Sequence, residues 1–259
     1  MIKPQSKPVE YYNEFQERMF NEDSLSELEY KRALKLLNNN KSIEAICAVG
    51  LAHALMGRKA DAVNWFESLA PFTDLFILKS YGSVLRFFGE NKKLIKLSLG
   101  YADSFKDAWF SWKNMDYYYT IGDISNSARK AREFLSMLLN DENKKRAEYS
   151  IAQQLEVLSL IYSSGHCTPE QFTVFSDLVF DILDKHEIPI RYVEMFYWGE
   201  DGTSYEIGVP IKKGDFTTLR KLNDELIKRI VKIEELDGCE VMPCFTHGGM
   251  SNWRYTHGA

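Results

Sequence analysis

The stretch that decides the fold is residues 43–71, IEAICAVGLAHALMGRKADAVNWFESLAP, in which Gly57 separates two segments rich in apolar residues. Apolar residues recur here mostly at intervals of three and four, which is the spacing of amphipathic helices. Gly50 and Ala62 have almost no side chain, so two antiparallel helices can approach closely there, while Phe66 fills the gap that opens further along. The stretch therefore predicts a pair of packed helices.

The bend at Gly57 recurs along the chain. Gly89 and Gly122 also each end one helical pattern and precede another, at intervals of 32 and 33 residues. Repeats of that length are usually helix pairs. The second repeat keeps Gly82 and Gly89, whereas the third repeat retains mainly Gly122 and Phe134. The alternative to a repeat is an irregular helical bundle in which the glycine spacing is accidental.

This pattern resembles the tetratricopeptide repeat, which has a small residue in its first helix, glycine at the turn, alanine early in the second helix and then an aromatic residue. The resemblance covers residues 43–135, as one clear and two degenerate repeats. It implies an α-helical solenoid in which the first helices of successive pairs line a concave surface. Further helices are expected near residues 8–20, 25–38, 145–163 and 168–185.

The resemblance also implies which side chains enter that concave surface, because the family presents positions at fixed offsets before each turn glycine. In the first unit these positions are Glu44, Cys47, Leu51, Ala54 and Leu55. In the next two units the implied binding residues are Phe76, Lys79, Arg86, Phe87, Trp109, Trp112, Asp116 and Tyr119. Aromatic rings and cations suit a protein or peptide partner with apolar and acidic anchors. The alternative is that the aromatic residues of the third unit belong to the core.

The last part of the chain has the pattern of strands. Residues 190–198 are aromatic and β-branched, residues 204–209 alternate in polarity, and Glu200-Asp201-Gly202 lies between them, which predicts a hairpin. A helix with one apolar stripe follows and is closed by Gly238, before a short strand over residues 239–245. The order is strand, strand, helix, strand.

The fold class is therefore mainly α, a helical solenoid followed by a small α+β domain. Pro189 disfavours helical geometry at the residue before it, which places the boundary near residue 187. The predicted domains are a helical-repeat domain over residues 1–187 and an α+β domain over residues 188–259. The second is small enough that we expect it to pack against the helices, as a cap on the array or as a second binding surface.

The charge balance narrows the class of partner. The chain has 32 basic and 37 acidic side chains, a net charge of −5, which weakens attraction to nucleic acid or anionic lipid. No apolar run approaches the roughly 18 residues of a membrane span, and the first residues lack the apolar core of a secretory signal. Four cysteines are too few for a disulfide framework. We expect a cytoplasmic protein without nucleic-acid or membrane partners.

Signs of catalysis are weak. Cys239, Cys244, His247 and His257 offer zinc ligands at an atypical spacing, and the sequence has no phosphate-binding loop or dinucleotide fingerprint, so we expect neither a metal nor a cofactor. The expected function is that of a noncatalytic binding module, such as an adaptor, a chaperone-like protein or an inhibitory or immunity partner. The alternative is an enzyme or nucleotide-responsive effector with its site around His247, Arg254 and His257.

Overall fold

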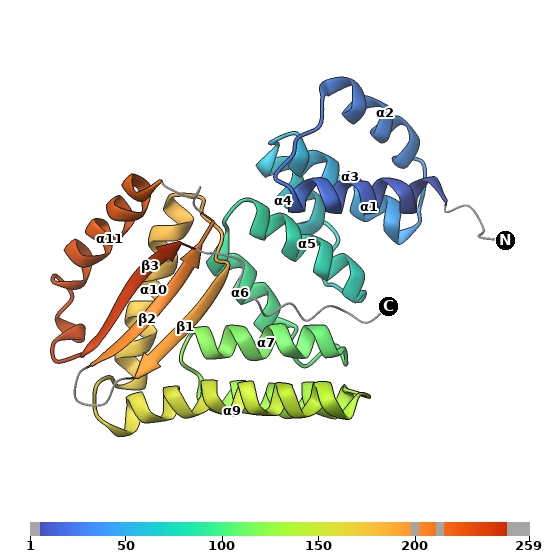
Figure 1. The fold of residues 1–259 in the computed structure, drawn as a ribbon. Coiled ribbons are helices and arrows are strands. Elements are labelled where there is room, and N and C mark those ends of the chain that lie inside the picture. Colours follow the sequence, from blue (N-terminus) through green and yellow to red (C-terminus); the bar gives the residue numbers. More distant parts are fainter. Residues whose placement is uncertain (1–5, 198–201, 211–214, 248–259) are drawn as a thin grey trace. The chain divides into compact units, whose positions relative to one another are not determined.

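The computed structural model describes residues 6–197, 202–210 and 215–247. In these ranges ten α-helices packed pairwise precede a unit with the order strand, strand, helix, strand (Figure 1). The prediction of a mainly α chain that ends in a small mixed sheet is confirmed. Packing divides the chain into two compact units, Met1–Glu90 and Asn91–Ala259.

The first unit is built around one enclosed helix. Its helices are α1 (Lys7–Phe20), α2 (Glu27–Leu37), α3 (Ile43–Leu55), α4 (Lys59–Glu67) and α5 (Leu75–Phe87). The other four helices all pack against α3, and nine of the thirteen residues of α3 are buried. A helix that is apolar on every side is stable in water only when its neighbours surround it.

The close approach of α3 and α4 has the cause that the sequence predicts. A Cβ atom added at Gly50 would lie 2.7 Å from Cζ of Phe66 and 2.9 Å from Cδ1 of Trp65. Such distances are shorter than van der Waals contact, so any side chain at this position would push the helices apart. The absence of a side chain at Gly50 is therefore what lets the two helices pack.

Three glycines end their helices in the same way. Gly57, Gly89 and Gly122 have positive φ angles of 70°, 66° and 80°. In each case the glycine N–H and the N–H that follows it donate back to carbonyl groups of the last helical turn, which is the Schellman arrangement. The next helices begin two residues after the glycines, at Lys59, Asn91 and Ile124. The prediction that these glycines mark equivalent bends is confirmed.

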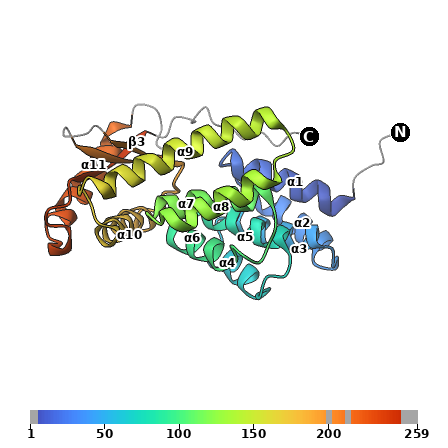
Figure 2. The same cartoon turned by 90° about the horizontal axis from the view of Figure 1, so that it is seen from below.

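The second unit contains five of the ten helices and the sheet. Its helices are α6 (Asn91–Gly100), α7 (Ala108–Thr120), α8 (Ile124–Met137), α9 (Asp141–Ser163), α10 (Pro169–Lys185) and, within the sheet region, α11 (Phe216–Ile230). The remaining elements are β1 (Tyr192–Tyr197), β2 (Thr203–Val209), the short 3-10 helix η2 (Glu234–Leu236) and β3 (Val241–His247). Figure 2 shows α8 beside α7 and α9, against both of which it packs.

The sheet has the order β1-β2-β3, with β1 antiparallel and β3 parallel to β2. Helices α10 and α11 cover one of its faces (Figure 1). At the centre of this core Tyr205 is 0% exposed, packs its ring against Phe172 and Phe175, and donates a hydrogen bond of 2.9 Å to the carbonyl of Thr120. The sheet thus packs on the helices, as expected. Residue 187, where the sequence predicts a domain boundary, lies inside the second compact unit.

A buried polar contact fixes the start of α6. Asn91 is 3% exposed, and Asp184 of α10 accepts hydrogen bonds from its backbone N–H at 2.8 Å and its side-chain amide at 2.9 Å. Asp184 also accepts from the backbone N–H of Lys92 at 3.1 Å. The Asn91 side chain in turn bonds the carbonyl of Ile188 and the N–H of Ile190. Asp184 therefore caps a helix that begins 93 residues earlier in the chain.

A surface ion cluster between α10 and α11 contributes to stability in acid through the carboxyl group of Glu225. Lys185 and His186 each lie 2.9 Å from Glu225, and Arg229 contacts it as well. The hydrogen bond from His186, followed by those contacts, lowers the pKa of Glu225 to about 2. Since the ordinary glutamate pKa is about 4.3, this group stabilises the fold above that pH and loses its contribution as the pH falls toward 2.

We therefore expect Glu225→Gln to reduce the acid sensitivity of the protein. Urea unfolding near pH 6 and near pH 3 should show a smaller loss of free energy of unfolding for Glu225→Gln than for the wild type, because the variant has no proton to take up at this position. Glu156→Gln, at an exposed position on α9, is the control and should behave as the wild type. Equal acid sensitivity of all three proteins would contradict this role of Glu225.

Candidate protein-binding surfaces

Four of the five residues in the first predicted set of concave-face residues are enclosed, whereas Glu44 is half-buried. Cys47, Leu51, Ala54 and Leu55 are all buried. The reason is that α1 packs along α3. Burial also raises the pKa of the Cys47 thiol to about 12, so the thiol stays protonated. The expectation that this part of α3 lines an open groove is wrong, and these residues belong to the core of the first unit.

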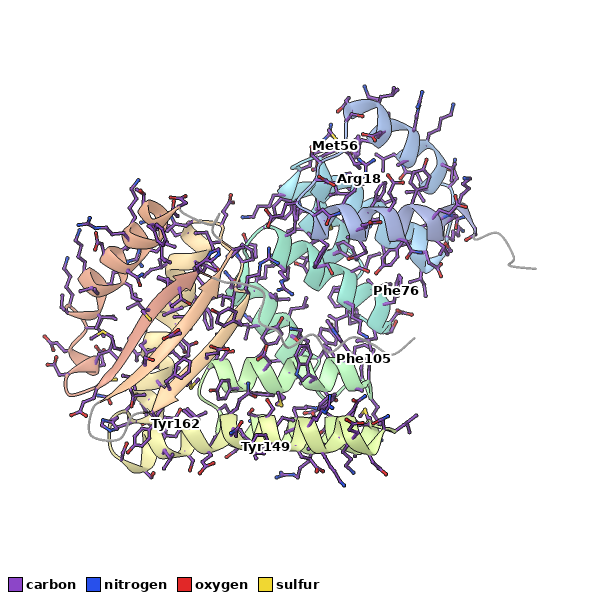
Figure 3. All side chains as sticks on the ribbon, viewed as in Figure 1. Arg18, Met56, Phe76, Phe105, Tyr149 and Tyr162 are labelled. Carbon is purple, nitrogen blue, oxygen red and sulfur yellow. The ribbon has the colours of Figure 1, made fainter. Side chains whose placement is uncertain are left out.

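The second predicted set lies on one face of α5, because its positions follow each other at helical spacing. We call Phe76, Lys79, Arg86 and Phe87 the α5 surface. Arg86 is exposed and the other three are half-buried. Phe76 (Figure 3) stands 4.5 Å from the ring of Tyr12 of α1, which therefore packs on the first turn of this surface. The end with Arg86 and Phe87 is the more accessible part.

The third set lies on α7 and separates into two environments. Trp109, Trp112 and Asp116 are half-buried, whereas Tyr119 is only 3% exposed and lies in the core shared with α10 and the sheet. Desolvation in this core raises the pKa of Tyr119 far above its ordinary value. Tyr119 is a core residue, and the prediction that it contacts a partner does not hold.

A lysine that the sequence did not single out joins the remaining α7 residues. The Nζ atom of Lys113 lies 4.2 Å from the centre of the Trp112 ring, which is a cation–π contact. Steps of three and four residues put these side chains on one helix face. The α7 surface is Trp109, Trp112, Lys113 and Asp116. Helical spacing was the available signal for Lys113, since it lies four residues after Trp109 on the same stripe.

One side of the Trp112 side chain packs on the protein core. It packs against a small core between α7, α8 and α9 that includes Met115, Phe134 and Ile151. The ring is therefore held in place on one side, while part of it stays accessible on the other. A preorganised aromatic ring loses little conformational freedom on binding, and such rings contribute much of the energy of protein interfaces.

The C-terminal cysteines and histidines, whose atypical spacing does not favour them as zinc ligands, do not gather into a metal site within the described residues. Cys244 lies on the sheet face opposite to that of Phe245, His247 is exposed at the end of β3, and Cys239 lies before this strand. In the described ranges no three histidine, cysteine or acidic side chains gather as metal ligands. His257 and Arg254 lie outside those ranges, so the alternative enzymatic site that depends on them stays a prediction.

Comparison of the chain with known protein families, with curated proteins and with solved structures finds no match. The fold itself defines the class: a mainly α protein whose paired helices are consistent with a helical repeat, followed by a small mixed sheet. None of the helices in the described ranges is long and apolar enough to cross a lipid bilayer.

Proposed function

We propose that this chain is a tetratricopeptide-like repeat protein of the cytoplasm that binds another protein or a peptide without catalysing a reaction. The observation that carries the proposal is the α7 surface, where partly accessible Trp109 and Trp112 share one helix face with Lys113 and Asp116. Support also comes from the α5 surface, which likewise combines aromatic rings with cations and, like the α7 surface, has an aromatic residue thirteen positions before its turn glycine.

The chemistry of both surfaces favours a partner with apolar and acidic anchors. Tryptophan and phenylalanine rings gain energy by covering apolar side chains, and arginine or lysine pairs with carboxylates. Arg86 is exposed at one end of the α5 surface, and Lys113 is held over the Trp112 ring on the α7 surface. Adaptor, chaperone-like and inhibitory roles all need this kind of contact.

The test begins with peptides selected from a random display library on the immobilised full chain. Enriched peptides should combine large apolar residues with aspartate or glutamate. Trp112→Ala, Lys113→Glu and Arg86→Glu should each weaken a peptide bound at their own surface about tenfold, which corresponds to ~1.4 kcal/mol. Lys113→Glu is the more specific test, because it reverses a charge on the α7 surface and keeps the Trp112 ring that packs on the core.

Two variants control for loss of an aromatic ring or a cation elsewhere. Tyr149 of α9 is 68% exposed and Arg132 of α8 is exposed, so Tyr149→Ala and Arg132→Glu should bind as the wild type does. Far-ultraviolet circular dichroism confirms that each variant keeps its helices. If the three surface variants bind every selected peptide as tightly as these controls, the proposal is wrong.

A further inference from the structure

Two cysteines from distant parts of the second unit lie against each other. Cys167 precedes α10 and is 2% exposed, while Cys239 lies between η2 and β3 and is half-buried. Both pack against the same core, their thiol groups interact, and the Cys167 thiol donates a hydrogen bond of 3.2 Å to the Thr168 carbonyl. Both are free thiols in this structure. The sequence gives no sign of this pairing, because the two residues belong to different local patterns.

The backbone on both sides of the pair is held in place. The N–H of Glu240 donates a hydrogen bond of 2.7 Å to the carbonyl of His166, so the residues next to the two cysteines are already paired. The Gln171 side chain donates to the carbonyl of Asp237 at 3.1 Å. These contacts join the two loops on either side of the sulfur atoms, which is the kind of fixed framework that a disulfide needs.

The two sulfur atoms differ in reactivity. The contact with Cys167, aided by a hydrogen bond with the backbone at Val241, lowers the pKa of Cys239 below its ordinary value. The same contact and burial raise the pKa of Cys167 far above its ordinary value. Cys239 is therefore the sulfur that ionises first, while Cys167 stays protonated and donates a hydrogen bond of 3.2 Å to the Thr168 carbonyl. The more accessible sulfur, that of Cys239, is therefore the nucleophile, and the buried sulfur of Cys167 lies next to it.

Two polar residues that contact each other, His166 and Glu240, are the chain neighbours of the two cysteines. His166 precedes Cys167 and contacts the carboxylate of Glu240 through Nδ1, while its ring meets Tyr197 edge-on at 5.6 Å. Glu240 directly follows Cys239, and it is the acidic group that opposes the formation of the thiolate. The pKa of Cys239 is lowered despite this opposition.

We propose that Cys167 and Cys239 are a redox-active dithiol that closes to a disulfide when it meets a low-molecular-weight disulfide. The Cys239 thiolate attacks one sulfur of the oxidant, which forms a mixed disulfide and releases one thiolate. Cys167 then gives up its proton and attacks the Cys239 sulfur, which forms the intramolecular disulfide and releases the second thiolate. Two protein thiols are oxidised, and the oxidant accepts two electrons and becomes two thiols.

The closed bond would tie the turn before α10 to the start of β3. These segments already border the same core, so oxidation would lock an existing contact and needs no rearrangement of the sheet. A cross-link of this kind restricts the unfolded chain, so the oxidised protein should unfold at a higher temperature than the reduced protein.

The test uses the full chain, treated first with a chelator and then with oxidised glutathione near neutral pH. Mass spectrometry of peptides prepared without reduction should show one linked pair that contains Cys167 and Cys239, with Cys47 and Cys244 still free. Dithiothreitol should reverse the link. In Cys167→Ala the reaction should stop at one glutathione on Cys239, whereas Cys239→Ala should leave Cys167 unmodified. Cys244→Ser is the matched control and should still form the link.

Several outcomes would overturn the proposal. Linkage through Cys244, persistent glutathione on Cys239 of the wild type, or no reaction of either cysteine while the fold is intact would each do so. Circular dichroism identifies any variant that fails to fold. The wild-type linkage does not depend on the variants, so the proposal stays testable in that case.

Discussion

Gly122→Ala should lower the free energy of unfolding of the second unit by about 3 kcal/mol, because it combines backbone strain with a steric clash. The φ angle of Gly122 is 80°, and an added Cβ would lie 2.5 Å from Cδ1 and 2.8 Å from Cγ of Phe172. Tyr162 also donates a hydrogen bond of 2.8 Å to the Gly122 carbonyl, so the neighbouring helices cannot move away without losing this contact. Urea unfolding followed by circular dichroism measures the effect.

Gly57→Ala is the matched control for this experiment. Gly57 has a similar φ angle of 70°, but among the described residues no heavy atom beyond its chain neighbours lies within 4 Å of the position that a Cβ would take. Only the cost of left-handed geometry remains, about 1 kcal/mol. The difference between the two variants therefore isolates the clash. Equal costs would mean that Phe172 does not pack against this turn as described.

Asp184→Ala should cost about 3 kcal/mol, although it removes only a carboxylate. Three N–H donors lose their acceptor, namely the backbone groups of Asn91 and Lys92 and the Asn91 side chain. Unsatisfied buried donors each carry a penalty of about 1 kcal/mol or more. The same measurement of unfolding by urea applies, and the loss should appear as an earlier midpoint with little change of slope.

Asp181→Ala is the control for Asp184→Ala on the same helix. Asp181 is exposed and pairs with Lys92 at 2.7 Å on the surface, where an ion pair contributes less than about 1 kcal/mol. The Asp181→Ala variant should therefore unfold nearly as the wild type does. If removal of Asp181 is as costly as removal of Asp184, capping of α6 is not the reason for the effect.

Local patterns predicted the parts of the fold that depend on neighbouring residues. Gly57, Gly89 and Gly122 each need a left-handed backbone, and this requirement is visible in the residue type itself. The strands were visible as alternation, and Gly238, with a positive φ angle, closes the segment before β3. Such features need no knowledge of what a segment packs against.

The parts that sequence reasoning missed or left open depend on which distant segments meet. Tyr119 has the spacing of a surface residue on α7, but it lies in the core shared by α10 and the sheet. The contact of Asp184 with Asn91 and the pairing of Cys167 with Cys239 likewise join segments that are far apart in the chain. Helical periodicity fixes which residues share a face of one helix, and it does not say which element will cover that face.

The enclosure of α3 has a consequence for how this protein can change over time. Substitutions at the nine buried residues of α3 are accepted or rejected mainly by shape, since these residues cannot reach a new partner. Substitutions that change what the protein binds are therefore expected mainly on its outer helices. Related chains should preserve the small residues of this helix while the exposed faces of α5 and α7 drift.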